Sequence, residues 1–428
     1  MKTTLKIRGS AGRKVIDGSI RVNGSKNDAV QAVASSFLFQ DGLTLENLPA
    51  IDDIDKMLEL AKLLGAKVEQ TDHNVTITAP KKLLQNGELD KKIAKHIRAS
   101  ILFTGPLLAR YGEVTFPHPG GCVIGARPID FFLDGFNRMG ATATESGDGY
   151  MIKAPPGGLK GAKIFFKNQT VTGTETFMMT ATQARGETML KNCAIEPEVE
   201  NLGQFLIKAG AKIEGLGTPT LTITGGATLQ SADRYFILPD RIEAGSLAIL
   251  GVLLARSLTI TDCRPDHLEA LLGVFEEMGV ELTTTDSSIM IRESEKPLRG
   301  VKVKTHEYPG LATDLQAPLA VLLTQAEGES EIVETIFESR FGYAEALAKM
   351  GAKVELLNQS RLKIVGPSAL RGETLVSPDL RAGLAYLLAG LTATGETTIL
   401  NVHFIDRGYE QVDKRLAALG LDILREEG

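Results

Sequence analysis

The sequence contains few cysteines and few histidines, and neither residue type is clustered. Three cysteines cannot all pair with one another in one chain, and none lies in a Cys-x-x-Cys or His-x-x-x-His arrangement. We therefore expect free thiols and neither structural zinc nor another bound metal. A thiol-based redox protein is also disfavoured, because Cys122 has no resolving cysteine near it in the sequence.

Long apolar runs are absent too. No stretch of about 18 residues is free of charges or turn signals, and the opening residues MKTTLKIRGSAGRK lack the apolar centre of an export signal. We expect a cytoplasmic protein with no membrane span. The net charge of −6 argues against nucleic acid as a diffuse partner, so an anionic ligand would need a local cluster of Lys and Arg.

The common nucleotide-binding loops are missing. The chain has no Gly-x-x-x-x-Gly-Lys-Ser/Thr run, which excludes the phosphate loop of nucleotide hydrolases. The segment GGCVIG is a poor match to the dinucleotide fingerprint and follows no βαβ pattern. A nicotinamide-dependent enzyme is therefore not expected.

What the chain does contain is an internal repeat. With 428 residues and 43% hydrophobic content it exceeds what one core normally supports, so two domains are expected. A helical apolar stretch that ends at a glycine and runs into a short strand occurs six times, as in MLELAKLLGAKVEQ. The repeated glycines are Gly65, Gly140, Gly210, Gly279, Gly351 and Gly420.

Each repeat also holds an earlier helix, which ends at a glycine in five of the six cases and leads into a β-rich segment. The order is therefore helix, strand, helix, strand, strand, and six such units suit two domains of three. Segments such as AVASSFLF and AYLLAGL have almost no polar side, so we expect these helices inside each domain with sheets around them. A binding solenoid is the structural alternative, although solenoid repeats are usually shorter.

Unusual polar residues gather where these helices are expected to begin. The first turn of a helix has free N–H groups and a partial positive charge, so it is suited to bind an anion. A Lys or Arg at this position is unfavourable with respect to the helix dipole, so its presence indicates a role other than helix stabilisation. Several such cations suggest a ligand with more than one phosphate or carboxylate. The helix-start residues that we single out are Lys26, Asn27, Arg98, Cys122, Arg127, Glu196, Asp314, Arg340, Asp379, Arg381 and Arg407.

Cys122 differs from the other two cysteines. It lies in PHPGGCVIGARP, among glycines that permit movement and five residues before Arg127, whose charge favours a thiolate. A cysteine kept for packing usually has apolar neighbours, which is the interpretation we favour for Cys193 and Cys263. Cys122 is therefore the candidate reactive thiol.

These segments together indicate a family. Over nearly the whole chain, a series of motifs in order closely resembles the UDP-N-acetylglucosamine 1-carboxyvinyltransferases, a family of enolpyruvyl transferases. These motifs are GSKNDAV, PGGCVIGARPID, TVTGTET, PDRIEAG, YPGLATDLQA, FESRFG, DLRAG and HFIDRGYE. The cysteine loop and DRGYE are the most specific of these motifs. The family catalyses the first committed step of peptidoglycan synthesis.

The resemblance implies an α/β fold, a two-domain inside-out α/β barrel of six βαβαββ units arranged three plus three, with substrates between the domains. One domain is inserted into the other, so residues 1–25 plus 240–428 are expected to form the C-terminal domain and residues 26–239 the inserted domain with the cysteine loop. The implied reaction moves the enolpyruvyl group of phosphoenolpyruvate onto the 3-hydroxyl of UDP-N-acetylglucosamine through a tetrahedral ketal and releases phosphate. It needs no cofactor.

The resemblance also implies residue roles. Cys122 matches the general acid that protonates the methylene carbon and that the epoxide fosfomycin attacks, and Asp314 matches the carboxylate that meets the sugar hydroxyl. Lys26 and Arg407 complete the implied catalytic set, and Arg340, Asp379, Arg381 and Glu196 are expected to support it. The implied phosphoenolpyruvate contacts are Lys26, Asn27, Arg127 and Arg407. The implied UDP-sugar contacts are Arg98, Arg127, Pro128, Ile129, Asp130, Phe131, Asp314 and Ile336.

Two alternatives remain open at this point. The sister enzyme that transfers enolpyruvyl to shikimate 3-phosphate shares fold and donor but lacks the cysteine loop. A non-catalytic paralogue could bind the nucleotide sugar and regulate the pathway, although Lys26, Cys122, Asp314 and Arg407 are all present. The sequence leaves the oligomeric state unknown.

Overall fold

The computed structural model describes residues 3–118, 120, 129–230 and 234–427, and these divide into two compact units. Unit 1 contains residues 3–23 and 239–427, and unit 2 contains residues 24–118, 120, 129–230 and 234–238. Cys122, Arg127 and Pro128 lie outside the described residues.

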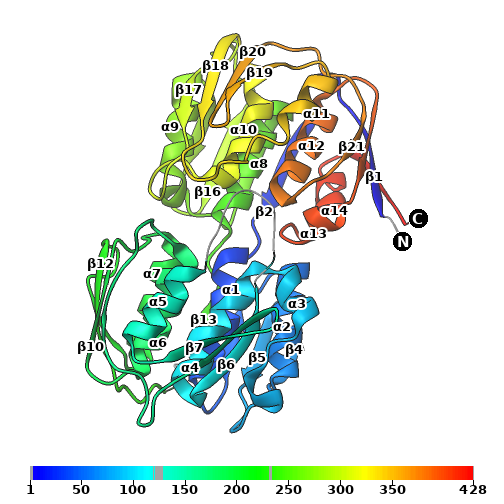
Figure 1. The fold of residues 1–428 in the computed structure, drawn as a ribbon. Coiled ribbons are helices and arrows are strands. Elements are labelled where there is room, and N and C mark those ends of the chain that lie inside the picture. Colours follow the sequence, from blue (N-terminus) through cyan, green and yellow to red (C-terminus); the bar gives the residue numbers. More distant parts are fainter. Residues whose placement is uncertain (1–2, 119, 121–128, 231–233, 428) are drawn as a thin grey trace. The chain divides into compact units, whose positions relative to one another are not determined.

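Unit 2 is built from short strands and helices that alternate along the chain (Figure 1). Its described strands are β3 (Leu43–Glu46), β4 (Lys67–Thr71), β5 (Asn74–Thr78), β6 (Glu113–Pro117), β7 (Thr142–Ser146), β8 (Gly149–Lys153), β9 (Lys163–Phe165), β10 (Glu187–Lys191), β11 (Lys212–Glu214), β12 (Thr220–Thr224) and β13 (Tyr235–Phe236). Its described helices are α1 (Lys26–Ser35), α2 (Asp52–Leu63), α3 (Lys91–His96), α4 (Thr104–Tyr111), α5 (Asp130–Arg138), α6 (Val171–Gln183) and α7 (Pro197–Lys208), with 3-10 turns η1 (Ser36–Leu38), η2 (Leu84–Gly87) and η3 (Arg98–Phe103).

One complete repeat shows how each unit is assembled. The segment from β9 to β12 follows the order βαβαββ, in which β9 lies parallel to β10 and both β10 and β11 pair antiparallel with β12. The helix between the two parallel strands is the crossover that such a connection requires. In the first repeat of unit 2 the parallel partner of β3 is instead β13, which comes from the end of the unit.

Unit 1 repeats the pattern with strands from both ends of the chain. Its described strands are β1 (Thr4–Arg8), β2 (Ile16–Arg21), β14 (Ala255–Thr261), β15 (Glu281–Thr284), β16 (Ser288–Arg292), β17 (Lys302–Lys304), β18 (Gly328–Val333), β19 (Lys353–Asn358), β20 (Arg361–Gly366), β21 (Thr374–Val376), β22 (Glu396–Leu400) and β23 (Asp422–Glu426). Its described helices are α8 (Arg241–Leu254), α9 (Glu269–Met278), α10 (Gln316–Leu323), α11 (Ala344–Lys349), α12 (Leu380–Thr392), α13 (His403–Asp406) and α14 (Val412–Ala417), with 3-10 turns η4 (Pro265–Leu268) and η5 (Thr313–Leu315). Strand β2 lies parallel to β14, and β1 pairs antiparallel with both β22 and β23.

The first helices of the repeats form the centre of each unit, as the wide apolar faces predict. In unit 1 the helices α8, α10 and α12 contact one another, and every residue of α10 and α12 is buried. In unit 2 the corresponding helices α4 and α6 contact each other. Across the described residues the strands form six small sheets around these helices, which excludes the solenoid alternative (Figure 1).

The repeated glycines occupy the conformation that their position in the pattern predicts. All six have positive φ, from 86° at Gly279 and Gly420 to 105° at Gly210. Side chains strongly disfavour this left-handed region, which is why glycine ends the second helix of each repeat. The helix-ending glycines earlier in the repeats behave in the same way, with φ of 83° at Gly112 and 92° at Gly395.

Candidate active site

Asp314 is the centre of a buried charge network in unit 1. It lies in η5, immediately before α10, and each of its oxygens accepts one hydrogen bond from a guanidinium group. Arg340 Nη2 lies 2.8 Å from Oδ1 and Arg381 Nη2 lies 2.7 Å from Oδ2. The arginine side chains are only 5% and 7% exposed, whereas Asp314 keeps 27% of its side-chain surface exposed. The two buried guanidinium groups thus fix the carboxylate, while part of it stays accessible to a solute.

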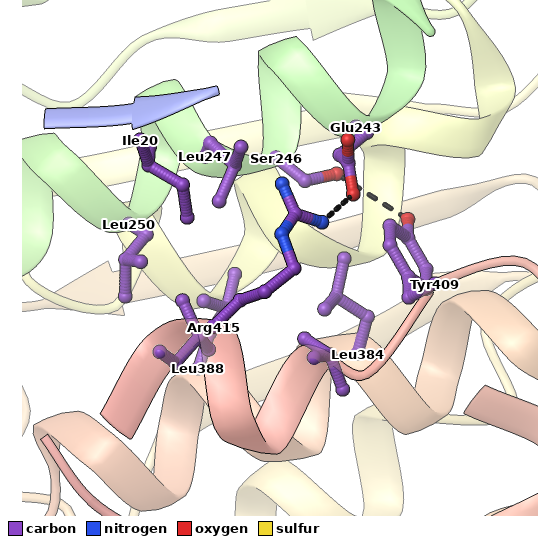
Figure 2. A pocket seen from close by; sticks show the side chains of 11 residues that line it. Ile20, Glu243, Ser246, Leu247, Leu250, Leu384, Leu388, Tyr409 and Arg415 are labelled. Carbon is purple, nitrogen blue, oxygen red and sulfur yellow. Dashed lines mark hydrogen bonds and ion pairs between the residues drawn. The ribbon is translucent and has the colours of Figure 1, made fainter. Parts of the chain in front are cut away.

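Tyr409 extends this network in a way that the motif DRGYE did not reveal. Its hydroxyl accepts a hydrogen bond of 2.7 Å from Arg381 Nη1, and it lies 3.5 Å from Ser246 Oγ. Figure 2 shows Tyr409 and Ser246 beside a small, mainly apolar cavity, with Arg415 paired to Glu243 on the same lining. Tyr409 and Asp314 therefore bind different terminal nitrogens of the Arg381 guanidinium, Nη1 and Nη2.

Two other predicted residues of unit 1, Asp379 and Arg407, lie at the ends of helices. Asp379 is the N-cap of α12, and its Oδ1 accepts hydrogen bonds from the backbone N–H groups of Arg381 (2.8 Å) and Ala382 (3.1 Å). Arg407 follows α13 and is 7% exposed. Its neighbour Asp406 receives two hydrogen bonds from Arg425 of β23, at 2.9 and 2.8 Å. The last strand therefore fixes the segment that carries Arg407.

Ile336 lies in the segment that leads to Arg340. Its backbone N–H donates to Glu334 Oε1 at 2.7 Å, and its side chain is half-buried. The structure therefore brings together Asp314, Arg340, Arg381 and, through Glu334, Ile336.

In unit 2 the predicted residues Lys26 and Asn27 are the first two residues of α1, as the helix-start argument requires. Lys26 Nζ lies 3.5 Å from Asp53 Oδ2, and Asn27 Nδ2 lies 3.5 Å from Glu198 Oε1. Ser25 is the N-cap of the helix. Both side chains are thus set at a helix N-terminus, where an anion is favoured.

Behind this helix start lies a group of buried acids. Asp28 accepts four hydrogen bonds, from Gln31 Nε2, Tyr235 Oη, Asn201 Nδ2 and the backbone N–H of Leu238. Burial raises the pKa of Asp28 to about 7, although these hydrogen bonds act in the opposite direction.

Glu175 belongs to the same buried group and does not cap its helix, because the N-cap of α6 is Thr170. Burial, followed by the charges of Glu198 and Asp28, raises the pKa of Glu175 well above its ordinary value. This shift favours protonation of Glu175, which lowers the negative charge beside Asp28 and Glu198. The predicted supporting residue Glu196 is the N-cap residue of α7, and it too is buried.

The remaining predicted UDP-sugar contacts of unit 2 differ in exposure. Arg98 begins η3 and is half-buried, whereas Asp130 begins α5 and is exposed. Ile129 is 8% exposed. Phe131 is half-buried, and its ring centroid lies 4.2 Å from that of Phe132. Of these four, Arg98 and Asp130 present polar groups at helix starts.

Cys193 and Cys263 are packed, which confirms the interpretation made for them. They are 0% and 1% exposed. Burial raises the pKa of the Cys193 thiol to about 12 and that of the Cys263 thiol to about 11. Neither is therefore a reactive thiol at neutral pH. Cys122, the predicted acid, lies outside the described residues.

Sequence reasoning missed two residues that organise Asp314, namely Tyr409 and Glu334. Glu334 could have been found, because Ser330, Ile332 and Glu334 alternate onto the buried side of the chain at β18. An acid in the inward phase of a strand is unusual and indicates a satisfied polar contact. Nothing in the spacing of Tyr409 indicated that it would contact Arg381.

Comparisons with known proteins identify the family to which the chain belongs. Residues 10–416 match the family described as EPSP synthase (3-phosphoshikimate 1-carboxyvinyltransferase). The UDP-N-acetylglucosamine 1-carboxyvinyltransferase of Koribacter versatilis is 45% identical over 413 residues, which cover 95% of this chain and 94% of that protein. The enzyme of the same name from Solibacter usitatus is 42% identical over 96% of this chain and 97% of that protein. Within the part of the chain that the structure describes, no helix combines the length and apolar character needed to cross a membrane.

Solved structures confirm the expected inside-out α/β fold. The enolpyruvyl transferase NikO from Streptomyces tendae superposes with a TM-score of 0.88 at 25% identity and covers 100% of this chain and 99% of that chain. An EPSP synthase from Acinetobacter baumannii reaches a TM-score of 0.76 at 18% identity, with 100% of both chains covered, which supports the fold alone. The chain therefore belongs to the EPSP synthase family of enolpyruvyl transferases and, within it, to the UDP-N-acetylglucosamine 1-carboxyvinyltransferases.

Proposed function

We propose that this chain transfers the enolpyruvyl group of phosphoenolpyruvate to the 3-hydroxyl of UDP-N-acetylglucosamine, a step of peptidoglycan synthesis, with Asp314 as the group that takes the hydroxyl proton. The observation that supports a place for Asp314 in the reaction is its pair of buried guanidinium groups, which hold the carboxylate in one orientation. They bind the ionised carboxylate and use one lone pair of each oxygen. The exposed part of the side chain is then available to orient an acceptor hydroxyl.

The reaction has two steps with balanced proton transfers. In the addition, the sugar oxygen bonds to C2 of phosphoenolpyruvate, its proton passes to Asp314, and C3 gains a proton from the predicted acid Cys122. In the elimination, the bond from C2 to the phosphate oxygen breaks, C3 returns a proton to the Cys122 thiolate, and the proton held by Asp314 passes to the leaving phosphate. Phosphate leaves and an enol ether remains.

Four residues are proposed to hold the donor, phosphoenolpyruvate. Lys26 and Asn27 at the start of α1 supply a positive charge and an amide where the helix dipole favours an anion. Arg127 and Arg407 are proposed as further phosphoenolpyruvate ligands, with Lys26 and Arg407 neutralising charge that develops during the addition. Arg98, the run from Arg127 to Phe131, and Ile336 are proposed for the UDP-sugar.

The arrangement of domains is part of the proposal. Residues 1–25 and 240–428 are proposed as the C-terminal domain and residues 26–239 as the inserted one. The pairing of β1 and β2 with strands of unit 1 supports this division. The buried network around Asp314 and the helix start at Lys26 then belong to different domains.

Phosphate release in the presence of phosphoenolpyruvate tests the function directly. We expect release with UDP-N-acetylglucosamine and none above background with shikimate 3-phosphate. Curated relatives that are 38–45% identical carry the former activity in their names, whereas the EPSP synthase structures are 18% identical. Release with shikimate 3-phosphate alone would favour the sister enzyme, and binding of the UDP-sugar without turnover would favour the regulatory paralogue.

A further inference from the structure

A buried carboxylate beside the Asp314 network has no part in the reaction as described above. Glu334 directly follows β18 and is 3% exposed. An ionised carboxylate in such a place is costly unless hydrogen bonds replace the lost water. Its contacts therefore indicate what it is there to hold.

Four donors surround this carboxylate. Oε2 accepts from Thr313 Oγ1 at 2.9 Å and from Gln316 Nε2 at 2.7 Å. Oε1 accepts from the backbone N–H groups of Ile336 at 2.7 Å and Phe337 at 3.1 Å. These four bonds match the acceptor capacity of an ionised carboxylate. A neutral amide of the same shape offers acceptors at only one of its two ends.

The four donors come from the two segments that form the Asp314–Arg340 pair. Thr313 and Gln316 flank Asp314 in η5 and at the start of α10. Ile336 and Phe337 begin the segment that ends at Arg340. One carboxylate therefore fixes both the segment of the acid and the segment of its guanidinium partner.

We propose that Glu334 is a positioning residue for Asp314 in the transfer reaction. It sets the backbone on either side of Asp314 against the segment of Arg340, so that the carboxylate meets the acceptor hydroxyl in one orientation. Misplacement of a reacting group by about 1 Å costs roughly 10²-fold in rate. The inference rests on the proposed function and adds to it a residue that does not touch the substrate.

Glu334→Gln is the most direct perturbation because it preserves size. The backbone N–H groups of Ile336 and Phe337 cannot become acceptors, so the new amide must turn its NH₂ towards Thr313 and Gln316. The Thr313 hydroxyl can rotate to accept, but Gln316 would have to flip its amide. Its Oε1 is buried and has no hydrogen-bond partner among the described residues, so the flip would leave a buried NH₂ unsatisfied at that position. The damage therefore falls on the Asp314 side.

The exchange Gln316→Glu/Glu334→Gln provides a rescue. A carboxylate at position 316 accepts from the amide at position 334, and the amide oxygen still accepts from the two backbone groups. Glu331→Gln is the matched control, because Glu331 lies on the same strand, β18, and pairs with Lys302 (3.8 Å) and Arg361 (3.4 Å) outside this network.

Steady-state kinetics with both substrates varied separates positioning from folding. We expect Glu334→Gln to lower kcat about tenfold or more. The KM for phosphoenolpyruvate should stay within about twofold, because a lost transition-state interaction lowers kcat without weakening ground-state binding. The control should keep wild-type kinetics, and the exchange should recover at least half of the loss on a logarithmic scale. Should Glu334→Gln fail to fold, Thr313→Val removes a single donor and should lower kcat about threefold or more.

Each result bears on the proposal. Equal kinetics of Glu334→Gln and Glu331→Gln would overturn it. A loss of kcat that the exchange does not repair, or one matched by an equal rise in the KM for phosphoenolpyruvate, would assign Glu334 to general packing and overturn it too. Wild-type protein without turnover would overturn the proposed function, and the positioning role with it.

Discussion

Replacement of Asp314 by Asn tests the charge network from its centre. The substitution keeps the size of the side chain but removes its charge and leaves one acceptor oxygen for two guanidinium groups. Arg340 and Arg381 donate to separate oxygens at 2.8 and 2.7 Å, so one of them loses its acceptor. The NH₂ of Asn then faces a cation that is 93% or more buried. Both stability and turnover should fall.

The expected sizes follow from the geometry. Breaking a buried ion pair costs about 3–5 kcal/mol when one partner is removed. Because Asp314 is 27% exposed and Asn still accepts one hydrogen bond, we expect a loss of about 2 kcal/mol in the free energy of unfolding. Removal of a catalytic base typically lowers the rate by about 10²–10⁴-fold. A lost hydrogen bond from the sugar hydroxyl to the carboxylate would weaken binding by about 10- to 10²-fold, since hydrogen bonds to charged groups are worth about 1.5–3 kcal/mol.

The assays are urea unfolding, phosphate release and calorimetric binding of UDP-N-acetylglucosamine. Asp266→Asn serves as the control, because Asp266 is also the second residue of a 3-10 turn in unit 1 but is 63% exposed. Near-wild-type turnover in Asp314→Asn would refute the role as base. Turnover and binding that fall by the same factor would show that Asp314 only binds the sugar.

Two further predictions concern buried titratable groups. At pH 8 the thiolate fractions of Cys193 and Cys263 should be about 10⁻⁴ and 10⁻³, since burial raises their pKa values to about 12 and 11. Fosfomycin with UDP-N-acetylglucosamine should therefore label Cys122 alone. A label mapped by mass spectrometry to either buried thiol would contradict this prediction. Burial raises the pKa of Asp28 from 3.8, its ordinary value, to about 7 in the folded protein. The folded protein therefore holds this proton more tightly than the unfolded chain, and the free energy of unfolding falls as pH rises from about 4 to about 7. Between pH 5 and 8 wild type should lose about 2–3 kcal/mol relative to Asp28→Asn in urea unfolding, and a difference independent of pH would show that Asp28 titrates elsewhere.

Features fixed by local chemistry could be predicted from the sequence. The glycines at helix ends follow from the absence of a Cβ atom, and Asp379 caps α12 because a short acid can reach the first free N–H groups. Lys26 begins α1 as its position in the repeat indicated. Each of these depends on a few neighbouring residues.

The partners of Asp314 could not be predicted, because they depend on packing between repeats. Asp314, Arg381 and Tyr409 come from three separate stretches of unit 1, and the sequence offers several arginines as equivalent partners. The contact is determined by how α10 and α12 pack in the core. The same limit applies to Arg425, whose two hydrogen bonds to Asp406 join β23 to the segment after β22.

The pairing of β1 has a consequence for the order in which the chain can fold during its synthesis. Leu5 lies opposite Ile399 of β22 and Arg425 of β23, so the first strand has no partner until almost the whole chain has left the ribosome. Unit 2 ends at residue 238, and its last described strand, β13, pairs with β3, so this unit has all its described strands much earlier.

Domains generally fold as units while the chain emerges, and contacts distant in sequence form late because closing a long loop is entropically costly. We expect unit 2 to fold first. Until β22 and β23 have been synthesised, Leu5 and Ile7 of β1 cannot pair in a sheet, although both are fully buried in the folded protein. The newly made chain therefore exposes the unpaired strand β1 for most of the time needed to synthesise residues 239–428, whereas β14, the partner of β2, is made early in that time. This is the period in which aggregation or capture by a chaperone would compete with folding.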